Sequence, residues 1–392
     1  MIGINDGHTF RSDHAEMTDD FAPGPGSDGG TVETPLAMKI AFLRGNGGGG
    51  GVAERETHMS LVFLTADRVH KLKKPVRFPY LDFSTLAARR RAVFAEVEIN
   101  RRLAPGVYLG VVPLTVGATG LELGGAGPVT DWLVVMRRLD ETDTLEAAIR
   151  GGRLDRPTLA RLADLLADFY AHAPRVHETR AAHLLARRRA LATDLRILSD
   201  RRFGLPQGPI GRVGRVQRRF LAERGDVLAR RLAEGRLVDA HGDLRPEHVF
   251  LGPSLAVIDR LEFDPRLRAM DPLDEIAFLD LECRRLGDLS VGEVLRRRLA
   301  PMLGDDPKSG LFLFYRSRHA LLRARLAIAH LYDPSPPTPE RWRRQAMSEL
   351  AHADADAVAL ERLLDGRRSR LRVRRRSIAG ERAALTHSRR TR

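Results

Sequence analysis

The residues best suited to do chemistry lie between Val238 and Asp259. The segment Val238-Asp239-Ala240-His241-Gly242-Asp243-Leu244-Arg245-Pro246-Glu247-His248 predicts a turn that carries an acid. Two short apolar runs follow, and Asp259 ends the second. Phosphoryl transfer needs such a pair, because one carboxylate orients the attacking hydroxyl and another holds the metal that bridges the phosphates. The alternative is a polar turn between two buried strands, in which these side chains bond to nearby backbone groups.

The His241-Gly242-Asp243 motif resembles the catalytic loop of the aminoglycoside phosphotransferase and choline kinase superfamily, where protein kinases carry His-Arg-Asp. The resemblance runs from about Ala37 to about Leu364. It is closest to a poorly characterised bacterial group in which an "ETHxSxVFL" strand, a "KxKKPV" strand and an "HGDLRPEH" loop occur together. It implies a two-lobed protein-kinase-like fold of the α+β class, with a small β-rich lobe and a mostly helical lobe. ATP or GTP is the implied co-substrate, with Mg²⁺ or Mn²⁺.

The resemblance assigns a role to each acid of the motif region. Asp243 is expected to be the catalytic base at the acceptor hydroxyl, and His241 to support the loop by hydrogen bonding. Asp259 resembles the Asp of the kinase D-F-G element, so we expect it to bind the metal. The sequence continues as Asp259-Arg260-Leu261, without Phe-Gly, which argues against a protein-kinase activation segment.

His248 departs from the kinase pattern, which places a metal-binding Asn five residues after the catalytic Asp. Mg²⁺ prefers oxygen ligands, whereas imidazole suits transition metals. We therefore expect His248 to bind a metal, to contact phosphate or substrate, or to mark weakened catalysis, with a plain structural role as the alternative. Glu247 and Glu262 are candidates to replace the missing oxygen ligand, and Asp264, with Glu262, to face a substrate cation.

Two further acids precede a predicted helix. Asp274 is expected to cap it, because a carboxylate accepts hydrogen bonds from free N–H groups at a helix start. Asp271, just before Pro272, is interpreted as a turn or cap residue in the same way.

A lysine for the phosphates is expected in the hairpin formed by residues 59–64 and 68–74. Lys71 and Lys73 point to one face because strand side chains alternate. The residue two before the phosphate lysine is expected to be apolar, to cover the adenine. Val69 meets this condition for Lys71, so Lys71 is our choice and Lys73 the reserve. A basic edge strand is the structural alternative.

The helix predicted over residues 84–103 is expected to supply the lysine's partner. The family's "ExxxN" segment falls on Glu96 to Asn100, which selects Glu96, with Glu98 as the fallback. The two side chains point about 200 degrees apart on a helix, so only one can face the lysine. Residues 110–116 and 131–136 are predicted to be the remaining strands of the small lobe. Met136 and Leu139 are candidate nucleotide contacts at the hinge that follows.

The remainder of the chain predicts helices and little else. These are expected at residues 145–150, 156–173, 181–198, 213–234, 274–286, 291–303, 311–331 and 339–364. We read the glycine run at 45–51 as an insertion rather than a phosphate loop, since no Gly-Lys-Ser/Thr follows it. Four segments result: a disordered extension (1–35), a kinase-like N-lobe (36–138), a helical C-lobe with the catalytic loop (139–366) and a basic disordered tail (367–392).

Charge and composition limit the alternatives. The chain has 392 residues and a net charge of +14, and the segment 367–392 holds eleven Arg and one Glu. That tail is the only feature that suggests nucleic acid or an anionic surface as a partner. One cysteine, Cys283, and the lack of a secretory signal or a long apolar run predict a cytoplasmic protein. A basic core does not favour cationic aminoglycosides as acceptors.

Three functions remain at this point. The first is a kinase acting on an unidentified small molecule. The second is a nucleotide-binding pseudokinase or regulator of the same fold, favoured by His248 and by the absence of a glycine-loop signature. The third is a nucleic-acid or membrane-surface binder that acts through the basic tail.

Overall fold

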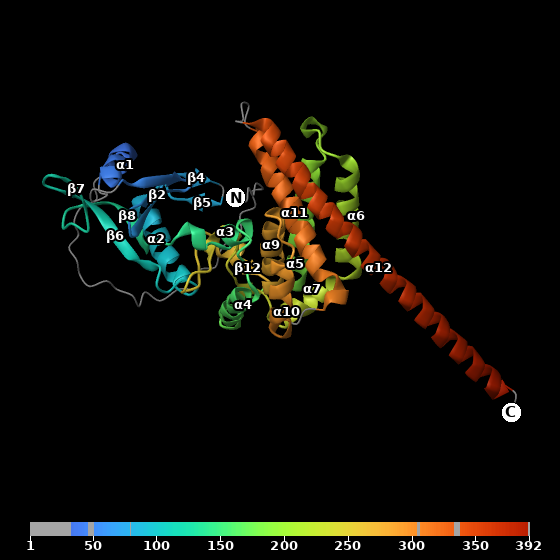
Figure 1. Ribbon diagram of the computed structural model, residues 1–392. Helices are drawn as coiled ribbons and strands as arrows, with labels where there is room; N and C mark the ends of the chain where they lie inside the picture. Colours follow the sequence, from blue (N-terminus) through green and yellow to red (C-terminus); the bar gives the residue numbers. More distant parts are fainter. Residues whose placement is uncertain (1–32, 46–50, 79, 304–305, 333–337, 391–392) are drawn as a thin grey trace. The chain divides into compact units, whose positions relative to one another are not determined.

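The computed structural model describes residues 33–45, 51–78, 80–303, 306–332 and 338–390. The chain divides into two compact units. The sheet unit contains the residues up to Ala148 together with Glu247–Arg268, and the helical unit contains Ile149–Pro246 and Ala269–Arg392. This division into a β-rich part and a helical part confirms the α+β class (Figure 1).

The sheet unit is built on six antiparallel strands in the order β1-β2-β3-β8-β6-β7. The predicted hairpin is present, with Val62 opposite Lys71. A two-stranded ribbon, β4 and β5, precedes helix α2. The bounds are α1 Leu36–Gly45, β1 Ala53–Glu56, β2 Ser60–Leu64, β3 Arg68–Lys73, β4 Arg77–Phe78, β5 Leu81–Asp82, α2 Leu86–Asn100, β6 Tyr108–Gly117, β7 Gly120–Leu123 and β8 Val129–Arg137.

Apolar side chains cover both faces of this sheet. Consecutive residues of β8 enter different cores: Leu133 packs with Leu43 of α1, and Val134 with Val93 of α2. Because neighbouring strand residues point to opposite faces, the sheet lies between α1 and α2 (Figure 1). Leu72 belongs to the α1 side. The alternation therefore places Lys71 and Lys73 on the face that α2 covers.

The sheet unit extends beyond the boundary predicted at residue 138. It includes α3 (Leu145–Arg150) up to Ala148, and the hairpin of β10 (Val249–Phe250) and β11 (Ala256–Val257). Phe250 and Ala256 are buried in the core against α2, and Phe250 forms a bridge with Thr144. Assigning this hairpin to the helical lobe was wrong, because its apolar side chains complete the core of the sheet unit.

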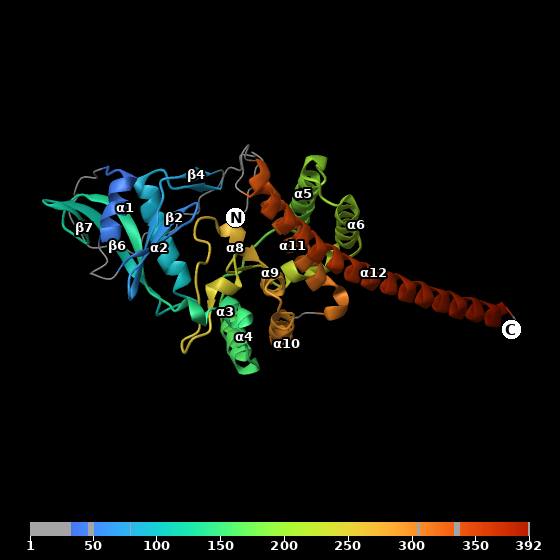
Figure 2. The ribbon, with the colours of Figure 1, turned by 45° about the horizontal axis from the view of Figure 1, so that its top comes forward.

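The helical unit surrounds α9, whose residues 272–283 are all buried. Helices α10 and α11 pack directly on α9 (Figure 2). The α-helices are α4 Arg156–Ala171, α5 Arg180–Leu198, α6 Gln207–Glu223, α7 Gly225–Ala233, α9 Pro272–Arg285, α10 Val291–Leu303, α11 Leu311–Ala329 and α12 Pro339–Arg390; β9 (Val238–Asp239) pairs with β12 (Ala269–Met270), and α8 (Pro265–Arg268) belongs to the sheet unit.

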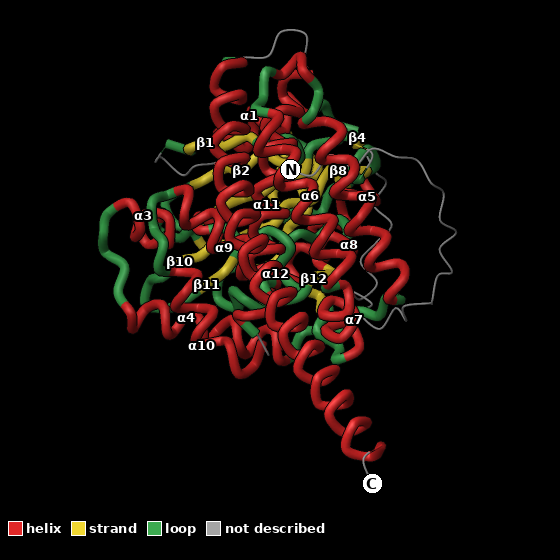
Figure 3. The backbone as a smooth tube through the Cα atoms, turned by 90° about the vertical axis from the view of Figure 1, so that its right-hand side faces the viewer, coloured by secondary structure: helices red, strands yellow, loops and turns green. Residues whose placement is uncertain are grey.

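Two helix predictions need correction. The single helix predicted over 213–234 is two helices, because the chain breaks at Arg224 and resumes at Gly225, a poor helix former. Helix α12 continues to Arg390 (Figure 3), so the basic segment is helical where a disordered tail was predicted. Arg, Ala and Leu favour helix, and no proline interrupts them. The predicted extension at 1–32 lies outside the described residues.

No helix in the described part of the chain is long and apolar enough to cross a membrane.

A buried ion cluster joins three elements of the sheet unit. The Asp131 carboxylate on β8 accepts hydrogen bonds from Lys39 Nζ of α1 at 2.7 Å and from Arg89 Nε of α2 at 2.9 Å. All three side chains are buried. A cluster of this kind is costly to break, because each remaining charge stays out of water without its partner.

We expect Asp131→Ala to reduce the free energy of unfolding by about 3–5 kcal/mol, since it leaves two buried cations unpaired. Denaturant unfolding monitored by circular dichroism measures this loss. The control is Asp67→Asn, which removes an exposed pair with Arg68 and is expected to cost less than about 1 kcal/mol. A loss at Asp131 as small as the control's would contradict the role given to the cluster.

Glu349 of α12 is a buried acid whose ionisation opposes folding. Burial and the nearby Glu282 raise its pKa to about 7, although Arg285 lies 2.7 Å away. The folded state therefore keeps this proton over a pH range in which the unfolded chain releases it. Deprotonation of Glu349 therefore does not lower the free energy of unfolding below about pH 4.5. It lowers it progressively as the pH rises from there through 7.

Accordingly, Glu349→Gln is expected to raise the free energy of unfolding at pH 8 by about 2–3 kcal/mol and to change it little at pH 4.5. Urea unfolding at the two pH values tests this. Glu340→Gln, at an exposed position of the same helix, is the control and is expected to have no such pH-dependent effect. Equal effects of Glu349→Gln at both pH values would refute the assignment.

Candidate functional site

Lys71 of β3 lies between two carboxylates of the sheet unit. Its Nζ is 2.8 Å from Glu96 Oε1 of α2 and 2.7 Å from Asp259 Oδ1, just after β11. Burial opposes the charge on Lys71, but Asp259 and Glu96 raise its pKa well above the ordinary value. The Lys71 charge in turn holds the pKa of Asp259 far below its usual range. All three groups are therefore ionised at neutral pH.

The reserve residues of the sequence analysis lie differently. Lys73 is buried, and its Nζ contacts Glu96 Oε2 at 2.5 Å and the carboxylate of Glu262. Glu98 is exposed on the outer face of α2. The structure thus brings Lys71, Glu96 and Asp259 together, and Lys73 neutralises the second oxygen of Glu96.

The backbone at Asp259 is strained and held by side chains. Asp259 has φ +64°, a left-handed conformation that a non-glycine residue rarely adopts. Its N–H donates to the Tyr108 hydroxyl at 3.0 Å. The next residue, Arg260, donates its N–H to Asn100 Oδ1 at 2.8 Å and accepts from Asn100 Nδ2 at 3.3 Å. Strain supported in this way is found at functional sites.

His248 lies close to Asp259 but forms no complete metal cage with it. Its Nε2 is 3.7 Å from Asp259 Oδ2. Among the described residues, no three His, Cys, Asp or Glu side chains are grouped as metal ligands. Glu262, a candidate replacement ligand, is paired with Lys73, and Asp264, a candidate to face a substrate cation, is paired with Arg266. One carboxylate and one imidazole fit a cation that takes its other ligands from phosphate and water.

Three apolar side chains near the lysine are only partly buried. Val69, Leu139 and Ile258 pack against the core shared by α2 and β8. Met136 differs, because its side chain is buried inside that core on β8. Any contact of Met136 with a ligand would therefore have to come from its backbone.

The loop that carries Asp243 belongs to the helical unit. The ring of His241 is fully buried, and its Nδ1 accepts a hydrogen bond from the Asp243 N–H at 3.2 Å. Gly242 has φ +88°, a conformation that favours glycine. Arg245, farther along, lies 3.9 Å from Glu282 of α9. The loop is thus held by its own imidazole and by α9.

Glu275 is a functional candidate that the sequence analysis missed. Its buried carboxylate accepts hydrogen bonds from the backbone N–H groups of His241 at 3.1 Å and Gly242 at 2.7 Å. The Tyr170 hydroxyl donates to it at 2.8 Å. A signal was present in the sequence: an acid one turn after Asp271 falls among apolar helix positions, where an acid needs a partner.

Of the two acids expected to cap α9, Asp271 is the cap and Asp274 is not. Asp271 caps the helix, accepting from the Leu273 N–H at 2.9 Å. Asp274 lies inside the first turn, fully buried, and binds Arg187, Arg318 and His319. Pro272 at the first helical position moves the start of the helix two residues earlier than predicted.

Known proteins match this chain over much of its length, at modest sequence identity. No protein-family model matches the chain. Uncharacterised proteins of Mycobacterium bovis and Mycobacterium tuberculosis are each 32% identical over 287 residues, which is 72% of this chain and 56% of theirs. The chain therefore spans little more than half the length of these curated relatives.

Solved structures of small-molecule kinases are similar at low identity. A choline/ethanolamine kinase family protein from Mesorhizobium loti is 18% identical with a TM-score of 0.47, covering 82% of this chain and 99% of that one. The GDP complex of aminoglycoside 2'-phosphotransferase-IIIa is 14% identical with a TM-score of 0.48, covering 82% and 97%.

The anchoring role of Glu275 can be tested without any assumed substrate. We expect Glu275→Ala to accelerate hydrogen exchange at the amides of His241 and Gly242 at least tenfold, because both N–H groups lose their acceptor. Exchange measured by mass spectrometry over peptides covering 238–246 reports this change. Tyr170→Phe is the matched variant, since it removes the hydroxyl that donates to Glu275 and leaves the acceptor in place. Unchanged exchange in Glu275→Ala would contradict the role.

Proposed function

We propose that this chain is a kinase that transfers the γ-phosphoryl group of ATP or GTP to a hydroxyl of a small molecule. The observation that carries the proposal is Lys71, a partly buried cation paired with both Glu96 and Asp259. A cation fixed by a helix carboxylate, beside an acid at the end of a strand, is the arrangement that phosphate positioning requires.

The nucleotide would bind to the sheet unit. The Lys71 ammonium is positioned for phosphate oxygens, and Glu96 keeps it in place. Val69, Leu139 and Ile258 offer an apolar surface suited to the base. Backbone groups around Met136 and Leu139 are the proposed hinge contacts.

Asp259 and His248 would hold the metal. Asp259 stays ionised over the physiological range because Lys71 depresses its pKa. A bound Mg²⁺ or Mn²⁺ supplies charge neutralisation between the phosphates. The imidazole of His248 favours Mn²⁺ more than an asparagine would, since nitrogen ligands suit transition metals.

Asp243 would accept the proton of the acceptor hydroxyl. Two contacts position the loop that carries Asp243. The Asp243 N–H donates to the His241 ring, and the His241 N–H donates to Glu275 of α9. Positioning and electrostatic stabilisation supply most of the rate enhancement in such transfers.

A nucleotide-binding protein without turnover is the second candidate. His248 stands where kinases carry asparagine, and β1 and β2 are joined by Thr57-His58-Met59 rather than by a glycine loop. A surface-binding role of the basic tail stays a prediction, since the side chains of residues 367–392 lie outside the described part.

The decisive experiment compares nucleotide binding and slow ATP turnover in wild type, Asp243→Asn and Asp259→Asn, with Mg²⁺ or Mn²⁺. We expect Asp243→Asn to lower turnover about 10²–10⁴-fold while nucleotide still binds. Asp259→Asn is expected to abolish the metal dependence of binding. Asp226→Asn, an exposed site on α7, is the control.

Each outcome separates the candidates. Binding without turnover across an acceptor panel would select the pseudokinase. No nucleotide binding with either metal would reject both nucleotide-dependent functions.

A further inference from the structure

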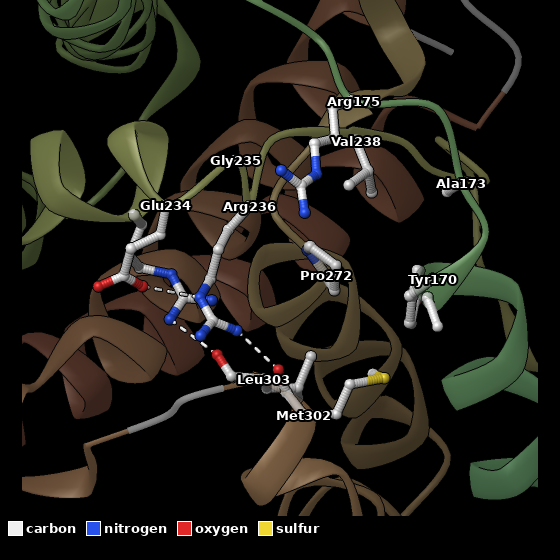
Figure 4. A pocket seen from close by; sticks show the side chains of 12 residues that line it. Tyr170, Ala173, Arg175, Glu234, Gly235, Arg236, Val238, Pro272, Met302 and Leu303 are labelled. Carbon is white, nitrogen blue, oxygen red and sulfur yellow. Dashed lines mark hydrogen bonds and ion pairs between the residues drawn. The ribbon is translucent and has the colours of Figure 1, made fainter.

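The helical unit contains a pocket that none of Lys71, Glu96, Asp243, His248 and Asp259 lines. It has a volume of about 250 Å³. Its walls come from the end of α4, the loop after it, the turn between α7 and β9, the start of α9 and the end of α10 (Figure 4). The lining includes the guanidinium groups of Arg175, Arg231 and Arg236 and the apolar side chains of Pro272 and Met302.

Two of the three arginines are already paired. Arg231 binds the Asp271 carboxylate, with Nη2 at 2.6 Å from Oδ1, and donates to the Leu303 carbonyl at 2.9 Å. Arg236 donates to Glu234 Oε2 at 2.9 Å and to the Met302 carbonyl at 2.6 Å. Both contacts of Arg236 are visible as dashed lines in Figure 4. These two guanidinium groups therefore build the floor of the pocket.

Arg175 is the third arginine of the pocket and differs from the other two. Arg175 is exposed, and within the described residues its side chain forms no ion pair and no hydrogen bond. Its backbone is fixed, because Arg175 bridges Val238 and its neighbours bond to the backbone of Leu237 and Asp239. Figure 4 shows its guanidinium directed toward Arg236 and Pro272.

Gly235 makes room for this side chain. It has φ +68°, and a Cβ on it would lie 3.0 Å from Arg175 Cδ and 3.1 Å from Nη1. The missing side chain lets the guanidinium lie over the turn between α7 and β9. Arg231 and Arg236 are paired with acids, whereas Arg175 has no carboxylate partner. The three arginines therefore leave one uncompensated positive charge at the pocket.

We infer that this pocket binds a small oxyanion, a phosphate or carboxylate group on a compact, otherwise uncharged molecule. The fork of Arg175 provides two parallel donors of the geometry that such groups match. Pro272 and Met302 would contact the uncharged remainder. The site is separate from the proposed phosphate site on the sheet unit, and it does not depend on kinase activity.

The test is calorimetric titration of the full chain with inorganic phosphate and, separately, with acetate. Saturable binding of either anion supports the inference, and the anion that binds more tightly is the one that the pocket prefers. Arg175→Gln is expected to weaken that binding at least tenfold, and Arg175→Lys less, because the ammonium keeps the charge and loses the fork. Arg188→Gln, at an exposed position of α5 with the same change in charge, is the control.

Binding at the phosphate site of the sheet unit is distinguished by location. Nitrogen-15 spectra of the arginine Nε groups should show a signal that shifts with the anion and is missing from Arg175→Gln. Absence of saturable binding by both anions would overturn the inference. So would an equal loss of affinity in Arg188→Gln, or binding that Arg175→Gln leaves unchanged.

Discussion

The ion pairs of Lys71 with Glu96 and Asp259 are the interaction on which the sheet unit depends. They join β3, α2 and the segment after β11, three elements that come from distant parts of the chain. A lysine buried without carboxylates would lose its proton or unfold its surroundings. Because Glu96 and Asp259 are both ionised, the charge is retained where water is scarce, and the strained backbone at Asp259 has a fixed partner. Lys73 and Glu262 extend the same network and keep the second oxygen of Glu96 neutralised.

Helix α9 plays the corresponding part in the helical unit. Asp274, Glu275, Asp280 and Glu282 are all buried along it. Three of these acids bind arginines, whereas Glu275 accepts from the backbone of the loop that holds Asp243. Buried charges of this kind contribute little net stability, but they are costly to leave unpaired and so restrict how the helices pack. The cost of burying an acid is visible at Glu349, where burial and the neighbouring Glu282 raise the pKa to about 7 despite the nearby Arg285.

The local elements were largely predictable from the sequence. Strand alternation placed Lys71 and Lys73 on one face, and the periodic segment at 84–103 is a helix. The contacts of the site residues were harder to predict from the sequence. Periodicity indicates which face of an element a residue occupies but not which residue it contacts. Glu275 was missed because the N–H groups that donate to it lie more than thirty positions away in the chain. Asp274 was taken for a cap because its arginine partners come from α5 and α11.

The sequence by itself determined the class of fold, the hairpin with its two lysines, the helix with Glu96 and the acids that end a turn and a strand. These follow from spacing, alternation and turn chemistry, which act over a few residues. Only the tertiary structure decided that Lys71 rather than Lys73 meets Asp259, that residues 247–268 pack with the sheet, and that Glu275 holds the Asp243 loop. Those outcomes depend on which buried charges find partners across long stretches of chain, and burial is a property of the packed molecule.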